Sequence, residues 1–157
     1  PYTLNPGGPN HEELSCLIGL YEYFNNLYNH HFPNENNSLR KKIEKINELI
    51  SHHEEQIANP LLEYINSRND IKLIGKKKIE NKNRAPTISF TFDNQPSKNI
   101  SNKLIEKGVA TRNDNFYAWR CLKALGIDTD DGVIRTSMVH YNTSEDVEKL
   151  IKALKQI

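Results

Sequence analysis

One arginine stands inside a stretch whose alternation is typical of a β-strand, residues 133–139. Ile134, Thr136 and Met138 fall on one face of such a strand, and Arg135 falls on the other, more mixed face. A guanidinium group donates two parallel hydrogen bonds to a carboxylate or a phosphate, so an arginine near a strand end is suited to binding an anion. The strand pattern leaves two interpretations, an anion-binding group and an internal ion pair with Asp or Glu. By itself it favours the ion pair.

The other residue types that often do chemistry lack the spacing of a site. Cys16 and Cys121 form no CxxC pair and have no neighbouring histidine in the sequence, so we expect small core or boundary residues rather than nucleophiles. The histidines at 30–31 and 52–53 are adjacent, and neighbours on a helix point about 100° apart, so neither pair predicts a zinc site. A GxGxxG fingerprint and a P-loop are also missing. We therefore expect no metal.

Length and charge limit the class of protein. The chain has 157 residues and a formal net charge of +1 with both signs interspersed. That length suits one domain with a real core, and that charge balance predicts neither nucleic acid nor an anionic membrane as a partner. No apolar run approaches the length of a membrane span, and no signal peptide is recognisable. We expect a cytoplasmic protein, and the initial Pro1 suggests a piece of a longer chain.

The chain begins with a polar loop and a helix. Residues 1–9 contain Gly7 and Gly8, where the backbone is free to approach another group closely. Asn10 is a good helix cap, and apolar residues that recur at spacings of three and four follow it. We expect a helix that buries one broad face, made of Leu14, Leu17, Ile18, Tyr21, Phe24, Leu27 and Tyr28.

A second helix is expected after Ser38, which is a good cap. Its apolar stripe is Leu39, Ile43, Ile46 and Ile50. Pro60 lies inside the continuation of that pattern, so a kink or a restart is predicted near Asn59.

Strands and short helices alternate after residue 70. We expect strands at 71–75, 87–92, 109–112 and 133–139, and helices at 97–107, at 117–125 and from Thr143 or Ser144 onward. The first two strands pair through the lysine-rich loop between them. This order predicts an α+β fold, in which a helical pair is followed by a small mixed sheet with helices mainly on one face.

Four blocks of the sequence resemble, in order, the C-terminal part of class V aminotransferases and most of all cysteine desulfurase-like proteins. They are residues 4–14 (LNPGGPNHEEL), 85–90 (APTISF), 112–118 (RNDNFYA) and 133–143 (VIRTSMVHYNT). The resemblance implies a dimeric pyridoxal phosphate enzyme with the fold of aspartate aminotransferase, in which a small C-terminal domain follows a large cofactor-binding domain. Residues 1–30 would then supply the end of the large-domain region, with an active-site loop and a helix, and residues 31–157 the small domain.

The resemblance also implies roles for single residues. Arg135 matches the family arginine that binds the substrate α-carboxylate, which agrees with a forked donor at a strand end and places this role above the ion pair. Arg112 matches an arginine that opens the active-site loop of the small domain, and Asn115 lies in that loop. Tyr117 occupies the position where desulfurases proper have a nucleophilic cysteine, so the thiol is missing. We expect Tyr117 either to line the pocket with Phe116, where its hydroxyl group can bind substrate, or to pack on the first helix.

Gly7, Gly8 and Asn10 match a loop that in relatives reaches the cofactor phosphate of the neighbouring subunit. Gly8 stands where many relatives have a threonine, so a hydroxyl group is missing, although backbone N–H groups still suit a phosphate. The lysine that carries the cofactor in the family lies upstream of the matched blocks, and no residue of this chain takes its place.

The resemblance therefore implies the C-terminal domain of a pyridoxal phosphate-dependent transferase or lyase that acts on an amino acid. Its partners would be the upstream cofactor-binding domain and a second subunit of a homodimer. Without the lysine, the fragment alone is expected to bind no cofactor and to be inert. The alternative is a noncatalytic ligand-sensing or protein-interaction domain of α+β type, in which Arg135 belongs to an internal ion pair.

Overall fold

The structure, a computed structural model, describes residues 7–80 and 82–157. Residues 4–6 of the first family-like block lie outside the described part. The chain divides into two compact units, Pro1–Leu49 and Ile50–Ile157. The division between residues 30 and 31 that the resemblance implies stays a prediction. Among the described residues, no helix combines the length and the apolar character needed to cross a membrane.

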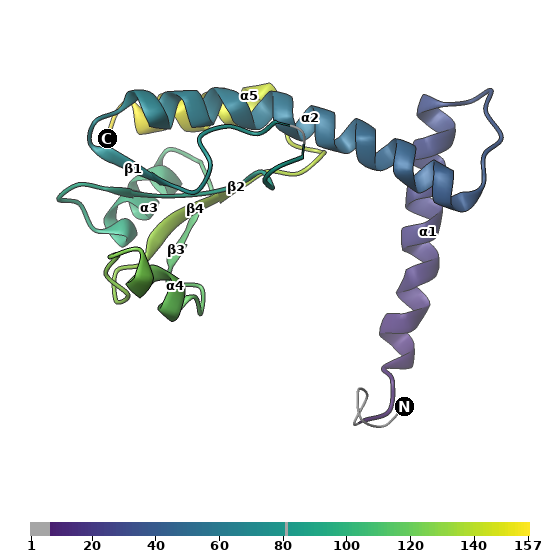
Figure 1. The fold of residues 1–157 in the computed structure, drawn as a ribbon, viewed down its shortest axis with the longest axis horizontal. Helices are drawn as coiled ribbons and strands as arrows, with labels where there is room; N and C mark the ends of the chain where they lie inside the picture. Colours follow the sequence, from purple (N-terminus) through teal and green to yellow (C-terminus); the bar gives the residue numbers. More distant parts are fainter. Residues whose placement is uncertain (1–6, 81) are drawn as a thin grey trace. The chain divides into compact units, whose positions relative to one another are not determined.

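The first helix, α1, runs over His11–His31 in the first unit and begins where the sequence predicts (Figure 1). Asn10 caps it, because Asn10 Oδ1 accepts hydrogen bonds from the backbone N–H groups of Glu12 and Glu13 at 3.1 and 3.2 Å. The expected broad buried face is wrong, since only Tyr28 is buried in this helix. Four residues of that face are 48% to 64% exposed, namely Leu14, Leu17, Ile18 and Tyr21.

The second helix, α2, runs over Leu39–Ser67 and passes from the first unit into the second. It begins directly after Ser38, as predicted. Of the kink or restart predicted near Asn59, the restart is wrong, because Pro60 lies inside an uninterrupted helix, whereas the kink stays a prediction. Leu61 and Leu62, which follow the proline, are fully buried. Burial of each contributes about 1.5–3 kcal/mol, which offsets the roughly 3 kcal/mol that a proline costs inside a helix.

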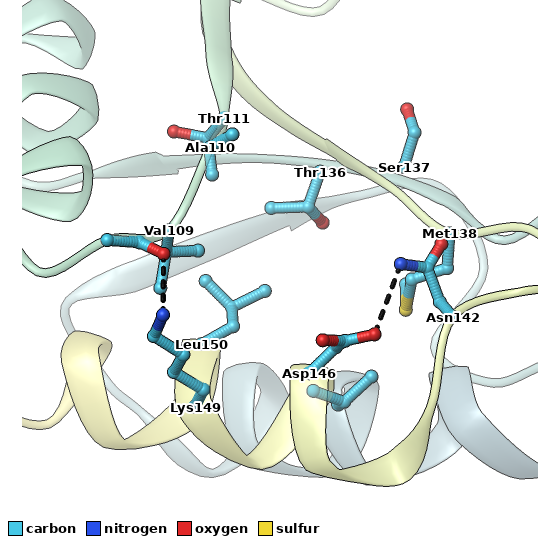
Figure 2. A pocket seen from close by; sticks show the side chains of 12 residues that line it. Val109, Ala110, Thr111, Thr136, Ser137, Met138, Asn142, Asp146, Lys149 and Leu150 are labelled. Atoms are coloured by element: carbon cyan, nitrogen blue, oxygen red, sulfur yellow. Dashed lines mark hydrogen bonds between the residues drawn. The ribbon is translucent and has the colours of Figure 1, made fainter.

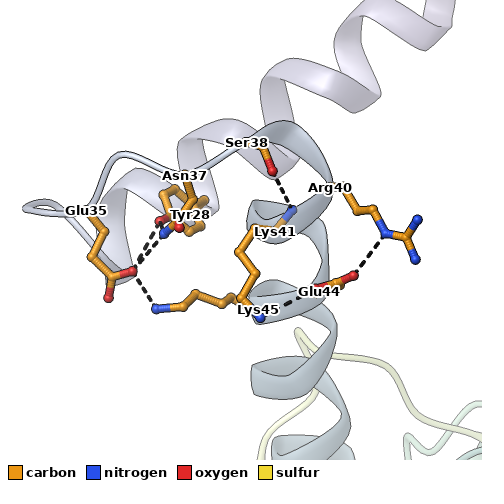
Figure 3. Close-up of polar contacts among 8 residues, drawn as sticks. All are labelled: Tyr28, Glu35, Asn37, Ser38, Arg40, Lys41, Glu44 and Lys45. Atoms are coloured by element: carbon orange, nitrogen blue, oxygen red, sulfur yellow. Dashed lines mark hydrogen bonds and ion pairs between the residues drawn. The ribbon is translucent and has the colours of Figure 1, made fainter.

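A polar network joins α1 to the start of α2 within the first unit (Figure 3). Tyr28 is fully buried, and Asn37 Nδ2 donates to its hydroxyl oxygen at 2.6 Å and to Glu35 Oε2 at 2.8 Å. The Lys45 ammonium group pairs with the same carboxylate oxygen and lies 4.7 Å from the centre of the Phe32 ring. The hydrogen bond from Lys45, aided by that from Asn37, holds the pKa of the Glu35 carboxyl group below its ordinary value.

Glu35→Gln should weaken the dependence of unfolding on pH in the acid range. A carboxyl group whose pKa is lowered by folding stabilises the folded state at pH values above its unfolded pKa. This stabilisation is lost as the pH falls through the folded pKa. For Glu35 the folded pKa lies below 4.5. In the wild type, the unfolding temperature measured by circular dichroism should fall between about pH 5 and pH 3, and more steeply than in the variant. Glu22→Gln, an exposed change on α1, is the matched control. Equal slopes for Glu35→Gln and the wild type would contradict this role.

Four strands of the second unit form one sheet in the order β1-β2-β4-β3 (Figure 1). They are β1 (Ile71–Ile74), β2 (Thr87–Phe92), β3 (Arg112–Asp114) and β4 (Val133–Ser137). The predicted α+β class, with a helical pair before the sheet, is confirmed. The sheet is antiparallel rather than mixed, since every neighbouring pair is antiparallel. β2 and β3 run in the same direction, but β4 lies between them and pairs with both, so no parallel pair forms.

One apolar core covers one face of this sheet. The helices of the unit are the second half of α2, α3 (Ser97–Glu106), α4 (Trp119–Ala124) and α5 (Ser144–Leu154). Phe90 and Ile134 are register partners on β2 and β4, and both are fully buried against helix residues such as Leu104 and Leu154. Figure 1 shows α2 and α5 over the same face of the sheet. The prediction that helices lie mainly on one face is confirmed.

The third strand begins later than the sequence predicts, because residues 109–111 are not part of it. The backbone N–H of Val109 donates to the Leu104 carbonyl at 2.9 Å, and that of Gly108 donates to the Ile105 carbonyl at 2.8 Å. Together with the positive φ of 71° at Gly108, these bonds form a Schellman closure of α3. The closure uses the backbone N–H of Val109, which a strand beginning at this residue would need for pairing. Ile105, an apolar residue in the last turn of α3, is 56% exposed.

Candidate functional site

Arg135 lies on β4, on the face of the sheet opposite to the core. The register places it directly opposite Ser89 of β2 on one side and Arg112 of β3 on the other. Directly paired residues of antiparallel strands point to the same face, so these three side chains form a row across the sheet. The neighbours of Arg135 along β4, Ile134 and Thr136, are buried. The alternation predicted for this strand is therefore confirmed.

The ring of Phe116 orients the guanidinium group of Arg135. The guanidinium carbon lies 3.9 Å from the centre of the ring, which is a cation–π contact. Arg135 Nε is buried and has no hydrogen-bond partner, and no other side-chain nitrogen or oxygen in residues 7–80 and 82–157 is in this state. Leaving a buried donor unpaired costs about 1–3 kcal/mol, and more for a charged group. The fold thus positions a cation whose buried Nε–H group has no acceptor among the described residues.

Two guanidinium groups share this face at adjoining positions. Neither Arg112 nor Arg135 belongs to any ion pair of the described residues. The internal ion pair that the strand pattern favours for Arg135 is therefore not found in the part of the chain that the structure describes. Like charges directly opposite each other destabilise a sheet. An anion bound between the two side chains would relieve that repulsion.

The loop after β3 has an unusual backbone conformation. Phe116 and Tyr117 have φ angles of 51° and 60°, in the left-handed region, where a residue with a Cβ atom loses roughly 1–2 kcal/mol. Asn115 offsets part of this cost, because its Oδ1 accepts the Tyr117 N–H at 3.0 Å and its Nδ2 donates to the Thr129 carbonyl at 3.2 Å. Backbone strain of this kind tends to occur at functional sites. Here it accompanies the contact between the Phe116 ring and Arg135.

The residues that the sequence predicts for this loop take different places. Arg112 lies beside Arg135, whereas Asn115 shapes the loop through its two hydrogen bonds. Tyr117 is 98% exposed, so it packs on no helix of the second unit, and its expected place beside the substrate stays a prediction. The expected helix at 117–125 begins only at Trp119 because of the left-handed residues before it. Phe116 contacts Arg135 from a left-handed backbone conformation. The sequence pattern does not indicate that conformation.

Gly7, Gly8 and Asn10 belong to the first unit, whereas Arg135 belongs to the second. A Cβ atom added at either glycine would meet nothing within 4 Å, and both residues are exposed, so their backbone is open to a ligand. Asn10 uses its side-chain oxygen to cap α1. Its Nδ2 group is the part of the side chain that remains to donate.

A cavity of about 220 Å³ lies between the end of β4, the start of α5 and residues 108–111 (Figure 2). Its charged side chains have partners in the cavity wall. Lys149 Nζ donates to a backbone carbonyl of that segment at 2.8 Å, and Asn142 Nδ2 donates to Asp146 Oδ2 at 3.4 Å. Arg135 does not line this cavity. The cavity is therefore separate from the row that Ser89, Arg135 and Arg112 form on the opposite face of the sheet.

The described residues contain no group of three or more His, Cys, Asp or Glu side chains suited to hold a metal ion. Cys16 and Cys121 are both exposed, so the expectation of core or boundary cysteines is wrong. Cys16 is exposed because most of α1 is exposed, and Cys121 is an exposed residue of the short helix α4. Residues 112–118 contain no cysteine.

The chain belongs to the class V aminotransferase family, since the family profile described as Aminotransferase class-V matches residues 38–150. The match includes Arg112, the loop after it and Arg135. It does not extend to Gly7, Gly8 and Asn10. The resemblance carried by the sequence blocks is thereby confirmed.

Two curated relatives show how much of a longer protein the chain resembles. The Aminotransferase-like protein FGM3 of Gibberella zeae is 33% identical over 109 residues, which are 69% of this chain and 27% of that protein. A probable cysteine desulfurase of Pseudomonas putida is 29% identical over 107 residues, which are 68% of this chain and 24% of that protein. The chain thus spans about a quarter of the length of the relatives it matches.

Solved structures share the fold. A cysteine desulfurase from Thermococcus onnurineus NA1 superposes with a TM-score of 0.60 at 22% identity, over 75% of this chain and 29% of that chain. The cysteine desulfurase CsdA from Escherichia coli gives a TM-score of 0.53 at 22% identity, over 66% of this chain and 25% of that chain. At this identity the comparison shows a common fold and nothing about substrate.

Proposed function

We propose that the chain is the C-terminal part of a pyridoxal phosphate-dependent enzyme that acts on an amino acid, and that Arg135 binds the α-carboxylate of that substrate. The supporting observation is the guanidinium group fixed on Phe116, with Nε buried and unpaired. A carboxylate accepts two parallel hydrogen bonds from a guanidinium group, which satisfies donors of this kind. Membership of the class V aminotransferases supports an amino acid as the substrate.

The cofactor proposal rests on the loop before α1. Gly7 and Gly8 leave backbone N–H groups accessible, and Asn10 retains a side-chain donor, so the three residues fit a phosphate group. We assign them to the cofactor phosphate of the neighbouring subunit in a homodimer, and we assign the cofactor-bearing lysine to the part of the relatives that this chain does not match. Bound pyridoxal phosphate withdraws electrons from the substrate Cα. The contribution of Arg135 is to orient the substrate by its carboxylate.

The same proposal includes the division of the chain into residues 1–30, at the end of the large-domain region, and residues 31–157, as the small domain. It also includes a location in the cytoplasm. The charge balance, with a net charge of +1, supports partners other than nucleic acid or an anionic membrane.

Sulfur release from cysteine through a thiol on the loop is not part of the proposal, although the Pseudomonas putida relative is named a probable cysteine desulfurase. The matched loop, residues 112–118, has Tyr117 where that thiol would stand. A nucleophilic sulfur must reach the reacting atom, and Tyr117 offers none. The noncatalytic alternative gains no support, since Arg135 makes no ion pair within the described residues.

The full-length polypeptide should copurify with a stoichiometric amount of pyridoxal phosphate and consume an amino acid. The 157-residue chain alone should retain none at a specific position, because the cofactor-bearing lysine is assigned elsewhere. Absorbance spectra and mass spectrometry of both proteins, after incubation with pyridoxal phosphate and dialysis, measure the difference. A stoichiometric adduct on the short chain that a single lysine substitution abolishes would overturn this assignment.

A further inference from the structure

We propose that the substrate carries a second acidic group, and that Arg112 binds this group while Arg135 binds the α-carboxylate. The site would then suit a dicarboxylic amino acid or a diacid of the same shape. This inference rests on the proposed function, because it takes the role of Arg135 from it.

The spacing of the two arginines fits two acidic groups of one small molecule. Arg112 and Arg135 are register partners on neighbouring antiparallel strands. Such partners have Cα atoms about 4.5–5.5 Å apart and side chains on the same face. Both long side chains are therefore able to reach the two ends of a four-carbon diacid. Ser89, on the other side of Arg135, adds a hydroxyl group to the row.

The balance of charge favours a ligand with two negative charges over a ligand with one. The nearest acidic residue on the same face of β3 is Asp114, whose Oδ1 instead accepts the backbone N–H of Asn115 at 2.6 Å. Asp114 belongs to no ion pair of the described residues. A single carboxylate on Arg135 would leave the charge of Arg112 without a partner. A diacid neutralises both and removes the repulsion between them.

The orientation of Arg135 also supports a directed arrangement rather than a loose basic patch. The Phe116 ring stacks on the guanidinium group of Arg135, whereas Arg112 is exposed and has no such contact with an aromatic ring of residues 7–80 and 82–157. One arginine is therefore fixed and the other is mobile enough to follow the second acidic group. We expect the larger share of affinity from Arg135 and the preference for a diacid from Arg112.

The test compares succinate with succinamate, which has the same shape but an uncharged amide in place of one carboxylate. Isothermal titration of the full-length polypeptide at constant ionic strength measures both affinities. The wild type should bind succinate about three- to tenfold more tightly, as expected for one partly exposed charge-assisted contact. Arg112→Gln should abolish this preference, because it weakens the binding of succinate far more than the binding of succinamate. Arg120→Gln, which removes the same charge from exposed α4, is the matched control and should preserve the preference.

The outcomes separate this inference from the proposed function. Equal affinities for succinate and succinamate in the wild type, together with weaker binding of both in Arg135→Gln, would overturn the inference and leave the proposed function standing. Affinities unchanged by Arg135→Gln would overturn both. A succinate preference that survives Arg112→Gln would show that the second acidic group binds elsewhere, which also overturns the inference.

Discussion

Gly132→Ala should lower the free energy of unfolding of the second unit by roughly 3 kcal/mol or more. A Cβ atom at this position would lie 2.3 Å from the carbonyl carbon of Asp114, 2.4 Å from its oxygen and 2.6 Å from the nitrogen of Asn115. These are backbone atoms, so no side-chain rotation relieves the overlap. The φ of 72° at Gly132 adds a further cost of about 1–2 kcal/mol for any residue with a Cβ atom.

Gly126→Ala is the matched control for this prediction. Gly126 has nearly the same φ, 69°, but an added Cβ atom would meet nothing within 4 Å. It should therefore cost only about 1–2 kcal/mol. Urea unfolding followed by the fluorescence of Trp119, the only tryptophan in the sequence, measures both variants. Equal losses for the two alanine variants would show that β3 and β4 do not approach each other closely at Gly132.

The approach at Gly132 also matters for the candidate site. It brings β3 against β4, which sets Arg112 opposite Arg135 and starts the loop that contains Phe116. The backbone packing at Gly132 thus helps to decide whether the two arginines adjoin.

Much of the fold follows from local patterns in the sequence. Asn10 caps α1 as predicted, and of the two expected starts of α5, Thr143 and Ser144, Thr143 is the cap and forms a capping box with Asp146. The alternation of residues 87–92 predicts the bounds of β2, and that of residues 133–139 predicts the buried face of β4, although β4 ends earlier than expected, at Ser137. These features depend on residues that are close in sequence, so each is predicted from the pattern of its own segment.

The rest depends on contacts between segments that are distant in sequence. The order of the strands, with β4 between β2 and β3, decides that no parallel pair forms and that Arg112 faces Arg135. The left-handed conformation of Phe116 is not a preference of its residue type, so the stacking on Arg135 was not predictable. The apolar stripe of α1 indicated a buried face, yet Leu17 is exposed, because periodicity indicates which face is apolar and not what covers it.

Arg135→Gln in the full-length polypeptide should lower kcat/KM for a carboxylate-bearing substrate about ten- to a hundredfold. The loss corresponds to about 1.5–3 kcal/mol for a charge-assisted pair of hydrogen bonds. Arg135→Lys should recover only part of this, because an ammonium group keeps the charge but lacks the planar fork that donates two parallel bonds. Arg40→Gln, at a guanidinium group on α2 with a 91% exposed side chain, should leave kcat/KM unchanged.

The most direct test compares kcat/KM for an amino acid with kcat/KM for the amine that lacks only its carboxylate, in the wild type and in Arg135→Gln. If Arg135 binds the α-carboxylate, the wild type prefers the amino acid, and the substitution lowers that preference about ten- to a hundredfold while the value for the amine stays the same. A preference that persists in a folded Arg135→Gln enzyme would contradict the assignment of Arg135 to the substrate carboxylate.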